Sequence, residues 1–394
     1  MTPPYFEYQS AVKLLCGENA LDRVADELRH LGATRPLVLT DAVLSKIGVA
    51  ARVCELMAAE GCPAAEIFSD IPVDSSLAVV NAIARFYRER ACDAIVAVGG
   101  GSVIDTAKGA RLVLSQEKDD ILSLSGVENL RRGRHIPFIV VPTTAGTGSE
   151  CTGVAVIRND EQGVKMEFLS PFVEPDVAVL DVRMTLRLPA RATAGTGMDA
   201  LVHAIEACTC LQQNPLSYAH GVSAIRLIAQ HLIEATQNGG NREARLAMAL
   251  AATQAGIAFS NSMVGAVHAI GHALGGVCHV PHAEAMNILL PHVMRCNLSH
   301  AAAGYAELLP YMIGWEPAAA IPAPARAEAL IAEVERLSAA LHQLAGLPRR
   351  LREVGVQEPD FPRVAESAVN DGALIVNPRM LDEAQVVELL RRAF

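Results

Sequence analysis

The stretch from Leu246 to Ala283 constrains the fold of this chain more than any other. Its 38 residues contain no Asp, Glu, Lys or Arg, yet they hold four histidines. An uncharged run of this length is typical of either a membrane span or a buried helical core. Gln254, Asn261 and recurring glycines interrupt the run, and these interruptions favour the buried core.

Two of these histidines, His268 and His272, are four residues apart. On a helix this spacing places both imidazoles on one face, one turn apart. A buried histidine needs a hydrogen-bonding partner, and backbone carbonyl groups alone would satisfy such a pair without any function. A second pair of the same spacing favours metal binding instead.

That second pair is Asp199 and His203, in an apolar helical pattern that runs from Gly195 to Glu206. A carboxylate among Ala, Leu, Val and Ile would be ionised and buried, so it requires a cation or a strong donor. One carboxylate and three imidazoles form a suitable ligand set for a divalent metal. We therefore predict a metal site made of Asp199, His203, His268 and His282.

The segments that carry these residues resemble the two signatures of the iron-containing, group III alcohol dehydrogenases. The resemblance rests on Gly195 to Glu206 and on Gly265 to Ala285. Within that family the chain is most similar to lactaldehyde/1,2-propanediol oxidoreductases and 1,3-propanediol dehydrogenases. The resemblance implies a dehydroquinate synthase-like architecture. The family name implies Fe2+, and the ligand set also suits Zn2+.

The length of 394 residues exceeds what one hydrophobic core usually serves, so we expect two domains. Pro189 is typical of the first turn of a helix and is taken as the boundary. We predict an α/β, Rossmann-like, dinucleotide-binding domain over residues 1–188, with a doubly wound and mainly parallel sheet. An all-α metal-binding and catalytic domain is predicted over residues 189–394.

Charge and cysteine content limit the partners of the chain. A net charge of −10 argues against nucleic acid and anionic membranes and leaves small molecules as ligands. The N-terminal residues do not form a signal-peptide pattern, so we expect a cytoplasmic protein. The nine cysteines follow no disulfide spacing and are predicted to be reduced thiols, with Cys208 and Cys210 packing a helix rather than binding metal.

Between Ala33 and Arg187, short β-branched runs alternate with amphipathic helical patterns, as in a doubly wound sheet. Pro36 to Thr40 is the first clear strand, and Asp41 follows its carboxyl end. A carboxylate there would accept from the ribose of NAD and repel the 2′-phosphate of NADP. Asp41 is equally suited to cap the helix predicted over 42–47, and the two roles are compatible.

A glycine-rich turn connects the strand predicted over 94–98 to a helical pattern. Glycines there allow backbone N–H groups and a helix N-terminus to approach a pyrophosphate. The turn consists of Gly99, Gly100, Gly101 and Ser102. The family has the same element, matched here also through Asp105 and Lys108, and the resemblance places Asp105 among the cofactor-binding residues.

A second loop, from Thr143 to Glu150, follows another buried strand predicted over 137–142. Hydroxyl groups and bare backbone suit nucleotide binding, although the spacing from Thr147 to Glu150 also fits a helix-capping box. The predicted contacts are Thr143, Thr144, Thr147 and Ser149. The resemblance adds Asp74, where the family commonly has Asn, and Lys165, whose alternative interpretation is an exposed surface lysine.

Beyond Pro189 the sequence predicts helices and no strand. The predicted helices cover residues 190–209, 217–236, 242–260, 265–275, 283–297, 325–344 and 383–392. The Pro-rich segment from Trp315 to Pro324 is predicted to be a surface loop.

Together these features predict a metal-dependent, NAD-linked alcohol dehydrogenase or aldehyde reductase (EC 1.1.1.-). A divalent metal would lower the pKa of an alcohol, and the nicotinamide would accept its hydride. The expected substrates are short primary alcohols or diols and their aldehydes. We assign His272 to proton relay, with an orienting role beside the metal as the alternative, and His279 to a turn.

Other functions stay open at this stage. One is a metal- and NAD-dependent lyase of the dehydroquinate synthase type, and another is a glycerol dehydrogenase-like polyol oxidoreductase. The lyase binds a phosphorylated substrate, which the absence of Lys and Arg from 246–283 disfavours. A hydrolase or a structural protein would leave the glycine- and threonine-rich loops unexplained. We also expect a homodimer or a higher homo-oligomer.

Overall fold

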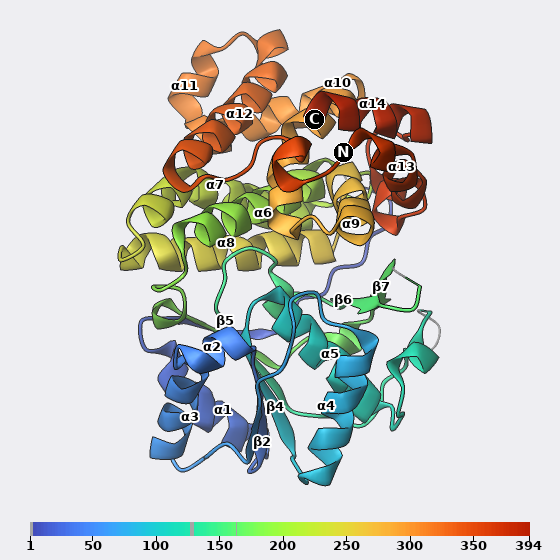
Figure 1. The fold of residues 1–394 in the computed structure, drawn as a ribbon. Coiled ribbons are helices and arrows are strands. Elements are labelled where there is room, and N and C mark those ends of the chain that lie inside the picture. The colour runs from blue at the N-terminus through green and yellow to red at the C-terminus, as the bar shows by residue number, and fades with distance from the viewer. Residues whose placement is uncertain (1–2, 127–129, 163) are drawn as a thin grey trace. The chain divides into compact units, whose positions relative to one another are not determined.

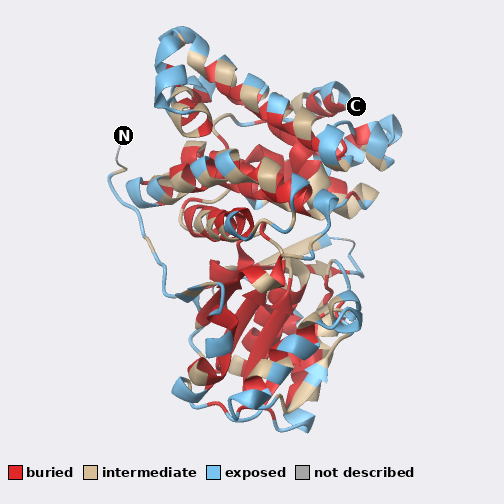
Figure 2. Cartoon of the chain, turned by 90° about the vertical axis from the view of Figure 1, so that its left-hand side faces the viewer, coloured by how far each residue is buried: buried red, intermediate tan, exposed pale blue. Residues whose placement is uncertain are grey.

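Six parallel strands form the main sheet of the chain, whose computed structural model describes residues 3–126, 130–162 and 164–394. The strands are β1 (Lys13–Gly17), β2 (Pro36–Leu39), β3 (Glu66–Phe68), β4 (Ala94–Gly99), β5 (Phe138–Pro142) and β8 (Val177–Asp181). Their order is β1-β8-β5-β4-β2-β3, and every neighbouring pair is parallel. The central strands are buried along their whole length, as Figure 2 shows, which is typical of a sheet covered on both faces.

Helices cover both faces of this sheet (Figure 1). They are α1 (Val24–His30), α2 (Ala42–Lys46), α3 (Val49–Ala59), α4 (Leu77–Glu89) and α5 (Gly101–Ser115). Alternate residues of each strand enter different cores: Ile95 of β4 packs in the cluster that includes α4 and α5, whereas Val96 packs in the cluster that includes α1 and α3. The doubly wound α/β fold is therefore confirmed.

Two parts of the sheet region have weaker sequence patterns than the central strands. The edge strand β1 precedes the strand that we expected to be first. Strands β6 (Val154–Asn159) and β7 (Val164–Leu169) form a separate antiparallel hairpin. Both lie at edges and are partly exposed, so their sequences lack the continuous apolar runs of the central strands.

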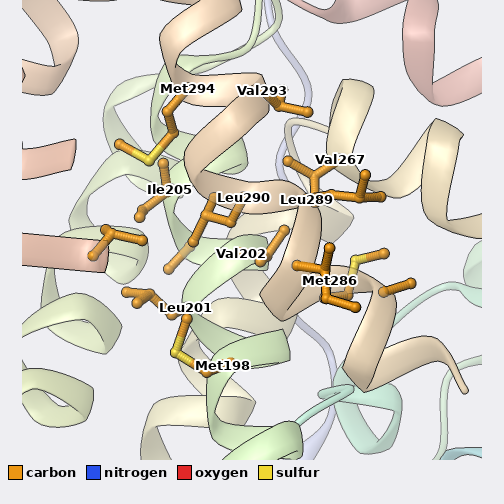
Figure 3. Packing of buried hydrophobic residues seen from close by; sticks show 14 of the residues in the cluster. Met198, Leu201, Val202, Ile205, Val267, Met286, Leu289, Leu290, Val293 and Met294 are labelled. Atoms are coloured by element: carbon orange, nitrogen blue, oxygen red, sulfur yellow. The ribbon is translucent and has the colours of Figure 1, made fainter. Parts of the chain in front are cut away.

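The remainder of the chain is helical, and within residues 188–394 the structure shows no strand. The helices are α6 (Ala190–Thr209), α7 (Pro215–Gln237), α8 (Arg242–Ser260), α9 (Ala266–Cys278), α10 (His282–Ile313), α11 (Trp315–Ala320), α12 (Arg326–Ala345), α13 (Phe361–Val369) and α14 (Glu383–Ala393). Side chains of α6, α9 and α10 meet in one large core (Figure 3). The uncharged run therefore supplies buried core helices, and none of the described helices is long and apolar enough to cross a bilayer.

The prediction of a surface loop over Trp315 to Pro324 is wrong. Residues Trp315–Ala320 form helix α11, and Ala323–Ala325 form a 3-10 turn. Pro317 occupies the first turn of α11, where a proline removes no helical hydrogen bond, and the buried Ala318 packs in the helical core. Helix α10 is also longer than predicted, because it continues through Pro310 to Ile313.

By contacts the chain forms two compact units. The helical unit comprises Met1–Tyr8, Ala145–Thr147 and Leu188–Phe394, and the α/β unit comprises Gln9–Thr144 and Gly148–Arg187. All nine cysteines are free thiols.

Candidate functional site

Helix α6 presents a line of small and polar residues at four-residue intervals, which therefore share one face. The line starts with Arg191 and Gly195 and continues to Asp199 and His203. Asp199 and His203 are buried, and Asp199 Oδ1 lies 3.8 Å from His203 Nδ1. Helix α6 thus brings a carboxylate and an imidazole together inside the helical core.

Helices α9 and α10 each add one histidine to this group. His268 Nε2 lies 4.0 Å and His282 Nε2 lies 3.4 Å from Asp199 Oδ1. The ligand atoms of Asp199, His268 and His282 all lie within 4.8 Å of one another. A tetrahedral metal with ligands at about 2.1 Å separates neighbouring ligand atoms by about 3.4 Å, so this spacing fits a metal ion.

Three of the atoms in this group are buried without a hydrogen-bond partner among the residues that the structure describes. They are Asp199 Oδ1, His203 Nδ1 and His268 Nε2. Buried polar atoms are rarely left unpaired in proteins. The orphaned atoms and the mixed carboxylate and imidazole chemistry fit a divalent ion. His203 differs from the other three predicted ligands. Its ring nitrogens do not belong to the group of Asp199, His268 and His282, whose ligand atoms all lie within 4.8 Å of one another.

Contacts between α6 and the start of α10 hold His282 in place. Arg191 forms an ion pair with Glu284, with Nη2 and Oε1 2.5 Å apart. One turn further along α6, a Cβ on Gly195 would lie 3.3 Å from the Cβ of Ala283. The absent side chain of Gly195 therefore allows the two helices to approach closely, and His282 begins α10 at that point.

The protonation of this group suits a metal. Burial lowers the pKa of His203 to about 3, and burial with the neighbouring His282 holds the pKa of His268 well below its usual value. Burial alone would raise the pKa of Asp199, but His203 and His282 lower it below the usual range of an aspartate. At neutral pH the site therefore offers the neutral imidazoles of His203 and His268 and an ionised carboxylate, as metal ligands require.

His272 lies on α9 one turn beyond His268, and 14% of its side-chain surface is exposed. Its ring stacks at 5.6 Å from the ring of His282, and its Nδ1 lies 2.9 Å from Asp371 Oδ2. Burial alone would raise the pKa of Asp371, but the hydrogen bond with His272 lowers it. His279 is the exposed, left-handed C-cap of α9, as expected for a turn residue.

Two carboxylates beside these histidines are missing from the sequence-based prediction. Asp371 lies 99 residues from its partner in sequence, and no pattern connects the two. Glu206, whose Oε2 lies 2.6 Å from His268 Nδ1, lies on the same helix as Asp199 and His203. Its position one turn beyond His203 is a signal that sequence analysis could have used.

The predicted nucleotide residues of the α/β unit gather at the carboxyl ends of parallel strands. Asp41 follows β2, the glycine turn follows β4, and Thr143 follows β5, and these three strands are adjacent in the sheet. The chain leaves the neighbouring strands β2 and β4 in opposite directions, from β2 to β3 on one side and from β4 to β5 on the other. Nucleotides bind at such switch points in open α/β sheets.

Local contacts shape this edge of the sheet. Asp41 caps α2, because its Oδ1 accepts from the Leu44 amide at 2.8 Å. Gly100 is the N-cap of α5, and a Cβ there would lie 3.2 Å from Oγ1 of Thr144. The missing side chain of Gly100 thus leaves room for the Thr144 hydroxyl at the N-terminus of α5. The 3-10 turn Ser149–Cys151 has the left-handed Gly148 as its N-cap.

Asp105 and Lys108 fasten the loop to α5. Asp105 is half-buried in the α/β unit, where Oδ1 accepts from Ser149 Oγ at 2.5 Å and Oδ2 from the Val156 amide at 3.1 Å. The fully buried Lys108 donates to Thr152 Oγ1 at 2.8 Å and to the Val154 carbonyl at 2.7 Å. The geometry of Asp105 is therefore that of a loop anchor.

Asp74 and Lys165 form an ion pair of 2.8 Å, in which the Lys165 side chain is only 15% exposed. Lys165 is therefore not the exposed surface lysine of the alternative interpretation. The Asp74 amide donates to Ser102 Oγ at 3.2 Å, so the pair lies beside the N-terminus of α5. Asp74 itself has a φ of 54°, in the left-handed region that Asp and Asn enter more readily than most other residues with a side chain.

Comparison with known proteins identifies the family. Residues 11–182 match the family described as "Iron-containing alcohol dehydrogenase", and residues 193–394 match "Fe-containing alcohol dehydrogenase family, C-terminal". This chain belongs to the iron-containing alcohol dehydrogenases. The expectation of an oxidoreductase of the iron-type, NAD-linked alcohol dehydrogenase class is confirmed at the level of the family.

Relatives of this iron-containing alcohol dehydrogenase cover nearly its full length. The 1,3-propanediol dehydrogenase of Citrobacter freundii is 37% identical over 380 residues, which are 96% of each chain. The NAD-dependent methanol dehydrogenase of Bacillus methanolicus is 34% identical over 377 residues, 96% of this chain and 97% of the relative. A solved structure of 1,3-propanediol oxidoreductase has a TM-score of 0.94 at 37% identity and covers 99% of this chain and 100% of that one.

Proposed function

We propose that this alcohol dehydrogenase reduces short-chain aldehydes to primary alcohols or diols with NADH and catalyses the reverse oxidation with NAD+. The observation that carries the proposal is the group of buried ligand atoms on Asp199, His203 and His268, beside His282, that have no hydrogen-bond partner within residues 3–126, 130–162 and 164–394. Fe2+ or Zn2+ held by these four residues would supply Lewis acidity to the oxygen of the alcohol or carbonyl. The propanediol relatives favour a small diol or hydroxyaldehyde as substrate.

The residues of the chain have separate tasks in this proposal. The imidazoles of His203 and His268 keep lone pairs available because burial disfavours their protonation. Phe259 stacks on His203 with ring centroids 4.4 Å apart, which restricts the imidazole and excludes water from that side. His272, oriented by Asp371 through Nδ1, exchanges a proton with the substrate oxygen through Nε2.

The proposed cofactor is NAD, bound at the carboxyl ends of β2, β4 and β5. Asp41 faces the ribose and repels the 2′-phosphate of NADP, and the N-terminus of α5 receives the pyrophosphate. The NAD dependence of the methanol dehydrogenase relative supports this choice. The proposed contacts are Asp41, Asp74, Gly99, Gly100, Gly101, Ser102, Thr143, Thr144, Thr147, Ser149 and Lys165, with Asp105 acting through its hold on Ser149.

The experiment combines metal analysis with a substrate panel. Protein purified without oxygen is analysed for bound metal, and NADH oxidation is followed with C2 to C6 aldehydes, hydroxyaldehydes and keto acids. We expect activity to rise modestly from C2 to C4, since each buried CH2 group contributes up to about 0.8 kcal/mol. A clear preference for carboxylate- or phosphate-bearing substrates would contradict the proposed substrate class.

Two variants test the metal ligands in the same assay. His268→Ala and His282→Ala should each lose metal and activity together. Full metal content and full activity in both variants would show that the ligand assignment is wrong.

Cytoplasmic location and assembly as a homodimer or higher homo-oligomer also belong to the proposal. Nine free thiols and a net charge of −10 are in keeping with a reducing compartment and small-molecule ligands. Cell fractionation tests the location, and light scattering on the purified protein tests the assembly.

A further inference from the structure

Glu206 connects the metal ligand His268 to the start of the helix that carries it. The glutamate lies on α6 and is 7% exposed. Its Oε2 lies 2.6 Å from His268 Nδ1, and its Oε1 accepts from the Val267 amide at 2.7 Å. Val267 is the second residue of α9, so one carboxylate contacts both the helix N-terminus and a side chain within its first turn.

The surroundings of Glu206 are built for this contact. Asn377 Oδ1 accepts from the Ala266 amide at 3.1 Å, and Asn377 exchanges hydrogen bonds of 2.9 Å with Asn297. A Cβ on Gly265 would lie 3.0 Å from Glu206 Oε1 and 2.9 Å from Asn377 Oδ1. Because Gly265 has no side chain, the side chains of Glu206 and Asn377 can both approach the N-terminus of α9. Such close packing fixes the Glu206 carboxylate.

The contact decides which nitrogen of His268 faces the metal site. An imidazole that donates Nδ1–H to a carboxylate carries its lone pair on Nε2. His268 Nε2 is buried, has no hydrogen-bond partner among the residues that the structure describes, and lies 4.0 Å from Asp199 Oδ1. Carboxylates in this arrangement fix the tautomer and the ring direction of histidine ligands and raise their basicity.

We propose that Glu206 is a positioning residue for the metal: by accepting the Nδ1 proton of His268 it holds the ring so that Nε2 binds the ion. The inference rests on the metal site proposed above. Because the same carboxylate also accepts from an amide at the N-terminus of α9, the direction of the His268 ring is fixed relative to that helix.

A second pair on the same helix supplies a matched control. His272 is one turn further along α9, and its Nδ1 pairs with Asp371 Oδ2 at 2.9 Å, so the two pairs have the same chemistry. His272 is not among the four proposed ligands. Neutralising Asp371 should therefore leave metal affinity unchanged, whereas neutralising Glu206 should reduce it.

The test is the affinity for Zn2+ alone, measured by chelator competition on metal-free Glu206→Gln, Asp371→Asn and wild-type protein. In Glu206→Gln, Oε1 still accepts from the Val267 amide, but an NH2 group faces His268 Nδ1 and favours the tautomer with its proton on Nε2. We expect the Kd for Zn2+ to rise about 10- to 100-fold. The metal-free variant should unfold close to the wild-type temperature, because the helix cap remains.

Three results would overturn the inference. One is wild-type Zn2+ affinity in Glu206→Gln while His268→Ala loses the metal, which would leave the metal site standing. Another is an equal loss of affinity in Asp371→Asn, which would mean that any charge change on α9 has this effect. Equal Zn2+ binding by wild type and His268→Ala would overturn the metal site as well.

A second variant serves if Glu206→Gln does not fold. Gly265→Ala keeps the carboxylate, but its methyl group pushes against Glu206 Oε1 and Asn377 Oδ1. We expect at least several-fold weaker Zn2+ binding in this variant. Unchanged binding would contradict the positioning role.

Discussion

Metal removal should lower the melting temperature of the helical unit, because only the folded chain assembles the proposed ligands. Asp199 and His203 lie on α6, His268 on α9 and His282 at the start of α10, so the third proposed ligand lies 65 positions after the second. An ion that binds only the folded state stabilises it by RT ln(1 + [M]/Kd). This amounts to about 4.1 kcal/mol at free metal of about 1,000 times Kd.

The size of the helical unit converts this free energy into temperature. Residues 188–394 form most of that unit. For domains of roughly this size, 1 kcal/mol shifts the melting temperature by about 2–4 °C. Adding Zn2+ to chelator-treated protein should therefore raise the melting temperature by about 8–16 °C, as measured by scanning calorimetry at fixed free Zn2+.

Two histidine variants make this experiment specific. His268→Ala should abolish the Zn2+-dependent shift. His279→Asn removes an exposed histidine of the same helix and keeps a residue that tolerates the left-handed conformation, so its shift should equal that of the wild type. A full shift in His268→Ala, or none in wild type at saturating Zn2+, would refute the reasoning.

Three further predictions concern the cofactor and the proton relay. Asp41→Asn keeps the hydrogen bond that caps the Leu44 amide but loses the negative charge. The NADPH-to-NADH ratio of kcat/KM should therefore rise about tenfold. An unchanged ratio would mean that Asp41 only caps the helix. His272→Ala should lower kcat by about 10²- to 10⁴-fold with near-stoichiometric metal, and loss of metal would exclude the relay. Lys165→Met should weaken NADH binding in a fluorescence titration. Asp74→Asn should strengthen NADH binding, because it releases Lys165 from the ion pair. If both variants bound NADH with equal affinity, Lys165 would not be a cofactor-binding residue.

The sequence carried enough information to predict the fold class and the four proposed ligands. Long apolar runs mark β4 and β5 because both faces of the sheet are covered. Asp199 and His203 were recognisable because a four-residue interval on an apolar helix leaves a carboxylate without water. Both patterns lie within short segments, so they can be recognised without knowledge of the rest of the chain.

Other features depend on contacts that no local pattern encodes. The partner of His272 is Asp371, far along the chain, and Asp371 is indistinguishable in sequence from any other turn aspartate. The loop predicted at Trp315 rests on the proline content of the segment, but Pro317 lies in the first turn of α11, where a proline is harmless. Asp105 shares a motif with the glycine turn, but its carboxylate binds Ser149 and Val156.

Hydride transfer itself can be followed directly. NADH deuterated on each face of C4 in separate reactions is incubated with propanal and either Fe2+-loaded or metal-free protein, and the 1-propanol formed is analysed by mass spectrometry. We predict that one of the two deuterated cofactors yields 1-propanol with a single deuterium on the carbinol carbon, only with the metal-loaded protein, and that the His268→Ala variant gives none. Equal deuterium transfer by the metal-free protein, or no transfer by the metal-loaded protein with any aldehyde of the panel, would contradict the account.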